Sequence, residues 1–101
     1  MEMAAALRPC LGALARHDRD LAGQLRRAAA PVVLNLAEGS GRWGKGRIQH
    51  YRIAAGSAAE AKAALELARV WGFVAAPLTR GPEALLLRVQ AMLWRLTQGR
   101  G

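Results

Sequence analysis

Residue types from which metal sites, disulfides and catalytic centres are built are scarce in this sequence. It holds one cysteine, Cys10, and two histidines, His17 and His50, which stand far apart without neighbours at ligand spacing. A lone cysteine excludes an internal disulfide and a cysteine-based metal site. We therefore expect no metal, no cofactor and no enzymatic activity, in a reduced, cytoplasmic protein.

Long apolar segments are also absent. No run approaches the roughly 20 apolar residues that a membrane-spanning helix needs. The stretch from Met1 to Ala15 is rich in alanine and leucine, but it contains Glu2 and lacks the basic start of a signal peptide. The sequence therefore predicts neither a membrane span nor a secretion signal.

Acidic residues are few relative to basic ones. Seven Asp and Glu stand against 15 Lys and Arg, which gives a formal net charge of +8, and 13 of the cations are arginines. The planar arginine fork suits phosphate, so RNA, DNA or another polyanion is the expected partner. A GC-rich genome would also favour arginine over lysine, but codon bias does not explain the excess of positive charge.

Large apolar side chains are in short supply, because much of the 52% hydrophobic content is alanine. Alanine buries little apolar surface, which is worth roughly 25 cal/mol per Å². A chain of 101 residues with this composition fits one domain, residues 1–101, with a thin core. Self-association as a homo-oligomer is therefore expected.

Helical periodicity is the main structural signal that is present. Leu21, Leu25, Ala28, Val32 and Leu36 repeat at helical spacing, and other segments show similar patterns. The short connections predict sequential antiparallel packing. The expected fold is all-α, an up-down antiparallel four-helix bundle with helices at about residues 2–16, 20–38, 47–71 and 82–97.

Three prolines affect where these helices are expected to begin, bend or end. Pro9 should end or bend the first turns of the first helix, whereas Pro82 suits the first turn of the fourth. Residues Pro31 to Leu36 could alone form a buried strand, but the helical periodicity continues through them and nothing else could pair with a strand. We keep this segment helical, with a kink. Asp18 or Asp20 is expected to cap the second helix.

Residues 39–46, GSGRWGKG, contain four glycines and are expected to form a loop, because glycine is unfavourable in a helix. The first seven match the G-x-x-x-x-G-K pattern of a phosphate-binding P-loop. Gly46 stands where that pattern needs a hydroxyl for magnesium, and no aspartate follows Asp20 to complete a metal site. The match is therefore interpreted as coincidence.

Basic and aromatic residues alternate from this loop into the third helix. Cations interleaved with aromatics are typical of surfaces that contact phosphates and stack on bases. The alternative is that the cations are merely solvated and that Trp43 packs against its own bundle or a neighbouring subunit. For the cations we favour contact with a polyanion, and for Trp43 we favour packing. The predicted nucleic-acid-binding residues are Arg26, Arg42, Lys45, Arg47 and Arg52, and Trp43 and Tyr51 lie among the last four.

Glu60 is an unusual carboxylate, because its helical neighbours on the third helix carry no charge. A carboxylate on such a face must find hydrogen-bond donors. One alternative is an acid and base pair of Glu38 with Glu60, but no nucleophile, histidine or metal set accompanies them. We favour a buried structural network that fixes helix register, formed by Gln24, Arg27, Asn35, Glu38 and Glu60.

Three motifs, in order, carry a family resemblance: RRAA at 26–29, NLAEGSGR at 35–42 and IAAGSAAE at 53–60. The segment of about residues 21–74 that holds them resembles the 23S ribosomal RNA intervening-sequence proteins. The resemblance implies a four-helix bundle that assembles into a ring, typically a homopentamer, with a basic surface and no established enzymatic activity. It also implies relatedness to the accessory variability proteins of diversity-generating retroelements, which partner a reverse transcriptase and nucleic acid.

The sequence departs from the family pattern in three respects. Pro31 stands where serine is usual and Val33 where proline is usual, the first helix is short, and the loop is rich in glycine. The leading hypothesis is a non-enzymatic homo-oligomer that binds RNA or DNA non-specifically through an arginine-rich surface. The alternative is a protein-interaction adaptor, such as an accessory subunit of a reverse transcriptase.

Overall fold

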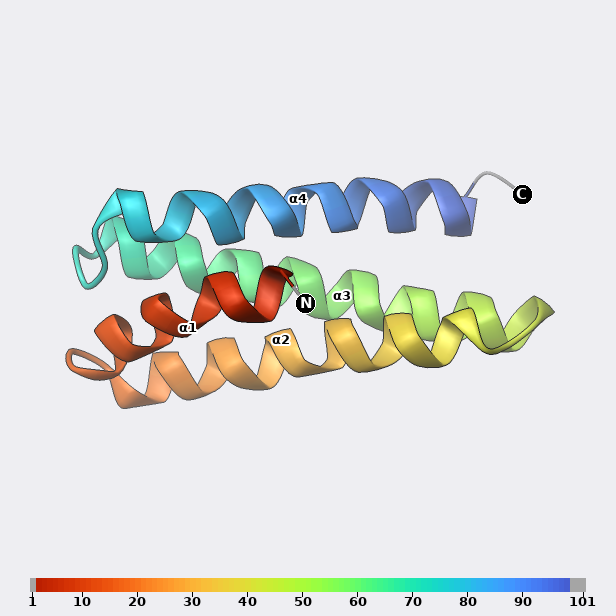
Figure 1. Cartoon of the computed structure of the whole chain (residues 1–101), viewed down its shortest axis with the longest axis horizontal. Coiled ribbons are helices and arrows are strands. Elements are labelled where there is room, and N and C mark those ends of the chain that lie inside the picture. The colour runs from red at the N-terminus through yellow and green to blue at the C-terminus, as the bar shows by residue number, and fades with distance from the viewer. Residues whose placement is uncertain (1, 99–101) are drawn as a thin grey trace.

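The computed structural model of the protein describes residues 2–98, which form helices joined by short turns and contain no strand. Successive helices run antiparallel in a bundle 42 Å long and 19 Å across (Figure 1). The prediction of an all-α, four-helix fold is confirmed. The helices are α1 (Glu2–Ala15), α2 (Arg19–Ser40), α3 (Gly44–Val70) and α4 (Ala76–Gln98).

Helix α1 is much shorter than its neighbours. Its 14 residues extend about 21 Å, whereas the 27 residues of α3 extend about 40 Å. α1 packs on α2 and α4, and its amino terminus lies near the middle of the bundle (Figure 1). The end of the bundle that carries the α2–α3 turn is therefore built from α2, α3 and α4 alone.

The main core lies where all four helices overlap. Leu7 and Leu14 of α1, Leu25 of α2, Leu65 of α3 and Leu86 of α4 are almost completely buried there. Most of the buried residues that α3 adds are alanines, whose small side chains let α2 and α3 approach closely along their length. The thin core expected from the alanine content is therefore a feature of the fold.

A second and smaller cluster fills the three-helix end. Tyr51 and Ala54 of α3 pack there with Leu93 of α4, and Leu36 and Val89 are partly buried against them. This cluster holds the last turn of α4 beside the first half of α3. It is the only part of the described core in which an aromatic ring is a buried member.

The start of α4 differs from the prediction. α4 begins at Ala76 and not at about residue 82, so Pro82 lies inside the helix. Pro77, one residue after the start, occupies the position in the first turn that had been expected for Pro82, where a missing backbone N–H is harmless. Within the same turn the Thr79 hydroxyl donates a hydrogen bond to the Ala76 carbonyl (3.2 Å).

Two further prolines also lie inside helices. α1 continues through Pro9 without ending there, and α2 continues through Pro31 to Ser40, which excludes a strand at residues 31–36. Packing of the apolar faces outweighs the loss of one backbone donor at each proline. At the start of α2, Asp18 is the cap, since its Oδ1 accepts a hydrogen bond from the Leu21 amide (2.9 Å).

Candidate nucleic-acid interface

The α2–α3 turn is far shorter than the glycine-rich loop expected for residues 39–46. Gly39 and Ser40 belong to α2, and α3 already begins at Gly44, so only residues 41–43 connect the two helices. Gly44 has a φ of +58°, a conformation that glycine adopts without strain. No strand precedes this turn, so the segment does not form the strand, loop and helix of a P-loop.

Arg47 braces this turn from the first part of α3. Its Nε donates to the carbonyl oxygens of Gly39 (3.2 Å) and Arg42 (3.0 Å). The guanidinium thereby gives a second hydrogen bond to the Gly39 carbonyl, which already accepts one from the Arg42 amide (3.1 Å), and places positive charge at the negative end of α2. Sequence reasoning assigned Arg47 to nucleic acid, and the structure gives it a role within the turn.

Trp43 projects from the turn into solvent. The guanidinium carbon of Arg47 lies 5.4 Å from the centre of the indole ring, and the side chain is 85% exposed. The prediction that Trp43 packs against its own bundle is therefore wrong. Contact with a neighbouring subunit and contact with a ligand remain as its two interpretations.

The prediction that Tyr51, like Trp43, is an aromatic available for stacking is wrong. Its side chain is 9% exposed and packs in the small cluster with Ala54 and Leu93. The ring lies directly against Gly39 of α2. The signal that could have identified Tyr51 as a core residue is its helical spacing to Ala54, Ala58 and Ala61, all of which are buried.

The remaining cations around the turn are exposed. Arg42, Lys45 and Arg52 all face solvent, and Lys45 and Arg52 are two turns apart on one side of α3. Among residues 2–98, Glu38 is the only carboxylate that pairs with any of them, at 3.5 Å from Arg42 Nη2, and this exposed pair is weak. We call the α2–α3 turn with Arg42, Lys45, Arg47 and Arg52 the basic tip.

Two further features add positive potential at this end. The amino terminus of α3 has no side-chain cap and no acidic residue in its first turn. Arg95 lies in the last turn of α4, which the contact of Leu93 with Tyr51 holds at the same end of the bundle. Sequence reasoning could not assign Arg95 to this site, because its position depends on how α4 packs on α3.

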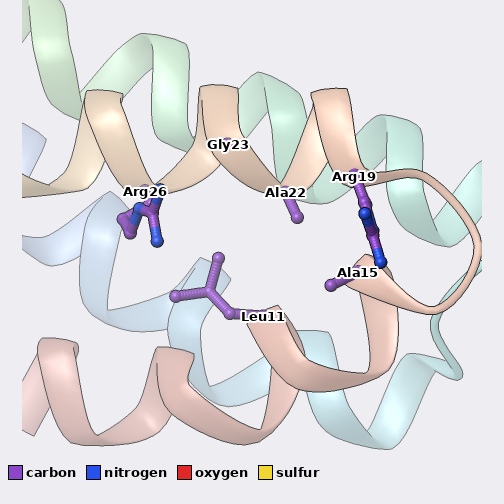
Figure 2. Close-up of a pocket in the computed structure, with 6 residues that line it drawn as sticks. All are labelled: Leu11, Ala15, Arg19, Ala22, Gly23 and Arg26. Atoms are coloured by element: carbon purple, nitrogen blue, oxygen red, sulfur yellow. The ribbon is translucent and has the colours of Figure 1, made fainter.

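Arg26 does not join the basic tip. It lies in α2, sixteen residues before Arg42, which is about 24 Å along the helix. Figure 2 shows Arg26 and Arg19, both on α2, at the two ends of a groove between α1 and α2, which Leu11, Ala15 and Ala22 also line. The groove has a volume of about 330 Å³, and an adjoining hollow of about 180 Å³ continues it past Leu11 and Arg26.

The predicted buried polar network does not exist as one unit. Gln24, Arg27 and Glu60 line the same shallow hollow between α2 and α3, but all three are exposed. Glu60 lies level with Gln24 and Ala28, and Glu38 lies further along α2 beside Arg42. The two carboxylates therefore cannot act as an acid and base pair, and the burial expected for Glu60 was wrong.

Asn35, the fifth member of that network, makes a different contact. Its Nδ2 donates to the Pro31 carbonyl (2.9 Å), and its Oδ1 lies 2.8 Å from His50 Nδ1 on α3. Because the amide oxygen accepts, Nδ1 of His50 carries the proton. The contact links α2 to α3 a few residues from the basic tip, which fits the register-fixing role expected of this network.

The described residues meet neither the requirements of a metal site nor those of a membrane span. Between Glu2 and Gln98 no three His, Cys, Asp or Glu side chains are placed to hold a metal ion. In the same range no helix is long and apolar enough to span a membrane. Cys10 is fully buried, and this burial, with the nearby Glu83 carboxylate, raises the pKa of its thiol.

Comparison with known proteins places this arrangement in a family. No curated protein and no solved structure matches the chain. A family model described as 23S rRNA-intervening sequence protein matches residues 10–95, from within α1 to the last turn of α4. The match covers most of the chain and includes all of α2, the basic tip and α3. The chain therefore belongs to the 23S rRNA-intervening sequence protein family.

Proposed function

We propose that this protein is a non-enzymatic homo-oligomer that binds RNA or DNA through phosphate contacts at its basic tip, without reading base sequence. The observation that carries the proposal is the exposure of Arg42, Lys45 and Arg52 around one turn, where Glu38 is the only carboxylate of the described residues that pairs with them. Arginine and lysine in such a cluster replace the counterions of a phosphate backbone. The family's description, which names a ribosomal RNA intervening sequence, is compatible with this role.

Salt dependence tests the proposal directly. Binding of the protein to random RNA and DNA oligonucleotides is measured by fluorescence anisotropy across a salt series. The variant R42Q/K45Q/R52Q should bind more weakly, and the slope of log affinity against log salt should fall by about 2 for three lost phosphate contacts on a single strand.

The matched control removes the same charge elsewhere. R8Q/R16Q/R80Q also replaces three exposed arginines, but these lie away from the basic tip. This control variant should keep most of the affinity for the oligonucleotides and most of the slope of log affinity against log salt. Equal losses in the two triple variants would show that net charge alone drives binding. Weak, salt-insensitive binding of the unmodified protein would contradict the proposal as a whole.

Assembly is the second part of the proposal, and we favour a ring-shaped homopentamer. The bundle has a thin core and leaves large apolar side chains exposed, among them Leu34, Val70 and Leu87. Covering such surface stabilises an oligomer. A ring would also present several basic tips to one nucleic acid, which raises avidity without new contacts. Light scattering should then give five times the 10.8 kDa of one chain.

A protein-interaction adaptor is the second candidate function, and the α1–α2 groove favours it. Arg19 and Arg26 border an apolar floor, and no carboxylate of residues 2–98 lines the groove or its adjoining hollow (Figure 2). This surface is complementary to an acidic, amphipathic segment of a partner, such as a reverse transcriptase. A protein that co-purifies after nuclease treatment and is lost in R19Q/R26Q would support the adaptor. Its retention in that variant would speak against the groove.

A further inference from the structure

We propose that Trp43 stacks on an unpaired base, so that the basic tip prefers single-stranded nucleic acid over a duplex. This inference rests on the proposed function and names the form of nucleic acid that the tip selects. Trp43 is the most exposed of the large apolar side chains in the described residues, although an indole ring is largely apolar. It stands at the apex of a turn among cations that can hold a phosphate backbone.

The turn holds the indole ready for stacking. Arg47 fixes the backbone on both sides of the turn through its bonds to the Gly39 and Arg42 carbonyls. Its guanidinium lies over the Trp43 ring at 5.4 Å, and the 85% exposure of the side chain leaves the rest of the ring open to solvent. A ring restrained before binding loses little conformational entropy when a base stacks on it. Arg47 is thus a positioning residue for Trp43.

Base stacking on Trp43 distinguishes single-stranded nucleic acid from a duplex, whereas phosphate contacts do not. Inside a duplex both faces of each base are covered by neighbouring base pairs, so an indole cannot reach them. In single strands, loops and bulges a base face is available to an aromatic side chain. Arg42, Lys45 and Arg52 can contact the phosphates of either form, so the discrimination is assigned to Trp43.

Trp43 could instead contact a second copy of the chain, because exposed tryptophans are also common at protein interfaces. Charge argues against it, since the indole is surrounded by cations that a copy of the same tip would repel. Two copies meeting at Trp43 would bring together two clusters of four cations with one carboxylate each. A polyanion relieves this repulsion.

Fluorescence provides the test. In the variant W71F/W94F, Trp43 is the only tryptophan, and the two residues replaced are themselves more than half exposed. This protein is titrated with an oligo(U) single strand and with an RNA duplex of equal length at one salt concentration. We expect quenching of Trp43 by the single strand, tighter binding of the single strand, and little quenching by the duplex.

Affinity measurements on the unmodified background complete the test. W43A should weaken single-strand binding about tenfold, within the range of one base stacked on an aromatic ring, and should leave duplex affinity and the salt slope unchanged. W43F should restore part of the loss. W94A, at another exposed tryptophan, should change neither. R47K keeps the charge but loses the fork, and should reduce the single-strand preference without changing the salt slope.

Three results would overturn the inference. The first is that W43A weakens single strand and duplex equally or not at all while the salt slope of the protein persists, and then the proposed function still stands. The second is shielding of Trp43 from acrylamide in the protein alone, which shows that another copy covers it. The third is the absence of salt-dependent binding to both the single strand and the duplex, which would contradict the proposed function as well.

Discussion

Gly39 in the last turn of α2 lies so close to the ring of Tyr51 in α3 that any side chain at position 39 would force the ring to move. A Cβ atom built on Gly39 would stand 2.5 Å from Tyr51 Cε1 and 2.7 Å from Cδ1. The ring therefore packs on bare backbone, and this contact sets how closely the ends of α2 and α3 approach. The basic tip begins only two residues later.

The first prediction follows from this contact. G39A should lower the free energy of unfolding by about 1 to 3 kcal/mol, because the added methyl group forces the Tyr51 ring out of its cluster. Urea unfolding measures the change. G56A is the matched control in the interior of α3, where nothing lies within 4 Å of an added Cβ. It should raise stability by about 0.5 to 1 kcal/mol. Similar effects of the two substitutions would contradict the role given to Gly39.

The second prediction concerns the link between Asn35 and His50. N35A should lower the free energy of unfolding by about 1 kcal/mol, since it removes a hydrogen bond between α2 and α3. H50A should have an effect of similar size. The double variant N35A/H50A should lose less than the sum of the two, because both single variants break the same contact. Additive losses would mean that the two side chains do not interact.

Sequence alone predicted the number of helices and their antiparallel order, because the spacing of Leu and Ala along α2 and α4 is unambiguous. The helix ends were less predictable. Residues 39–46 hold four glycines, yet only residues 41–43 lie outside the two helices. Gly39 stays helical because its lack of a side chain makes room for Tyr51, a tertiary reason that local propensity cannot reveal.

The candidate site was predicted in part. Sequence spacing identified the cations of the basic tip, but it could not separate Arg47, which binds carbonyl oxygens, from Arg42 and Lys45, which face solvent. It also placed Glu60 in the interior. A helix face without charged neighbours is not always buried, and the hollow that Glu60 lines between α2 and α3 is open.

The third prediction concerns the proline inside α2. P31A restores the backbone donor that Pro31 lacks for the carbonyl of Arg27, so it should raise the free energy of unfolding by about 1 to 2 kcal/mol. This gain is smaller than in a peptide helix, because alanine also frees the unfolded chain. P77A is the control in the first turn of α4, where no donor is needed, and it should change stability little. A P31A effect no larger than that of P77A would refute the prediction.

The fourth prediction concerns pH and Cys10. Burial of the thiol, and then the Glu83 carboxylate, raise its pKa in the folded protein above the ordinary value of about 8.5 that applies in the unfolded chain. Below that value both states hold the proton, and the stabilisation of the folded state is fully present. As the pH rises further, the unfolded state loses the proton first. Stability therefore falls, by at most about 1.4 kcal/mol per pH unit, until the folded thiol also ionises.

The measurement isolates the thiol by comparison with C10A, which cannot ionise. Unfolding free energies of both proteins are determined by urea between pH 7 and pH 10. C10A loses contacts in the core, so it should be less stable than the unmodified protein at pH 7, and this difference should shrink as the pH rises above about 8.5. Other groups titrate in both proteins alike and drop out of the difference. A difference that stays constant over the whole range would show that folding does not shift the ionisation of Cys10.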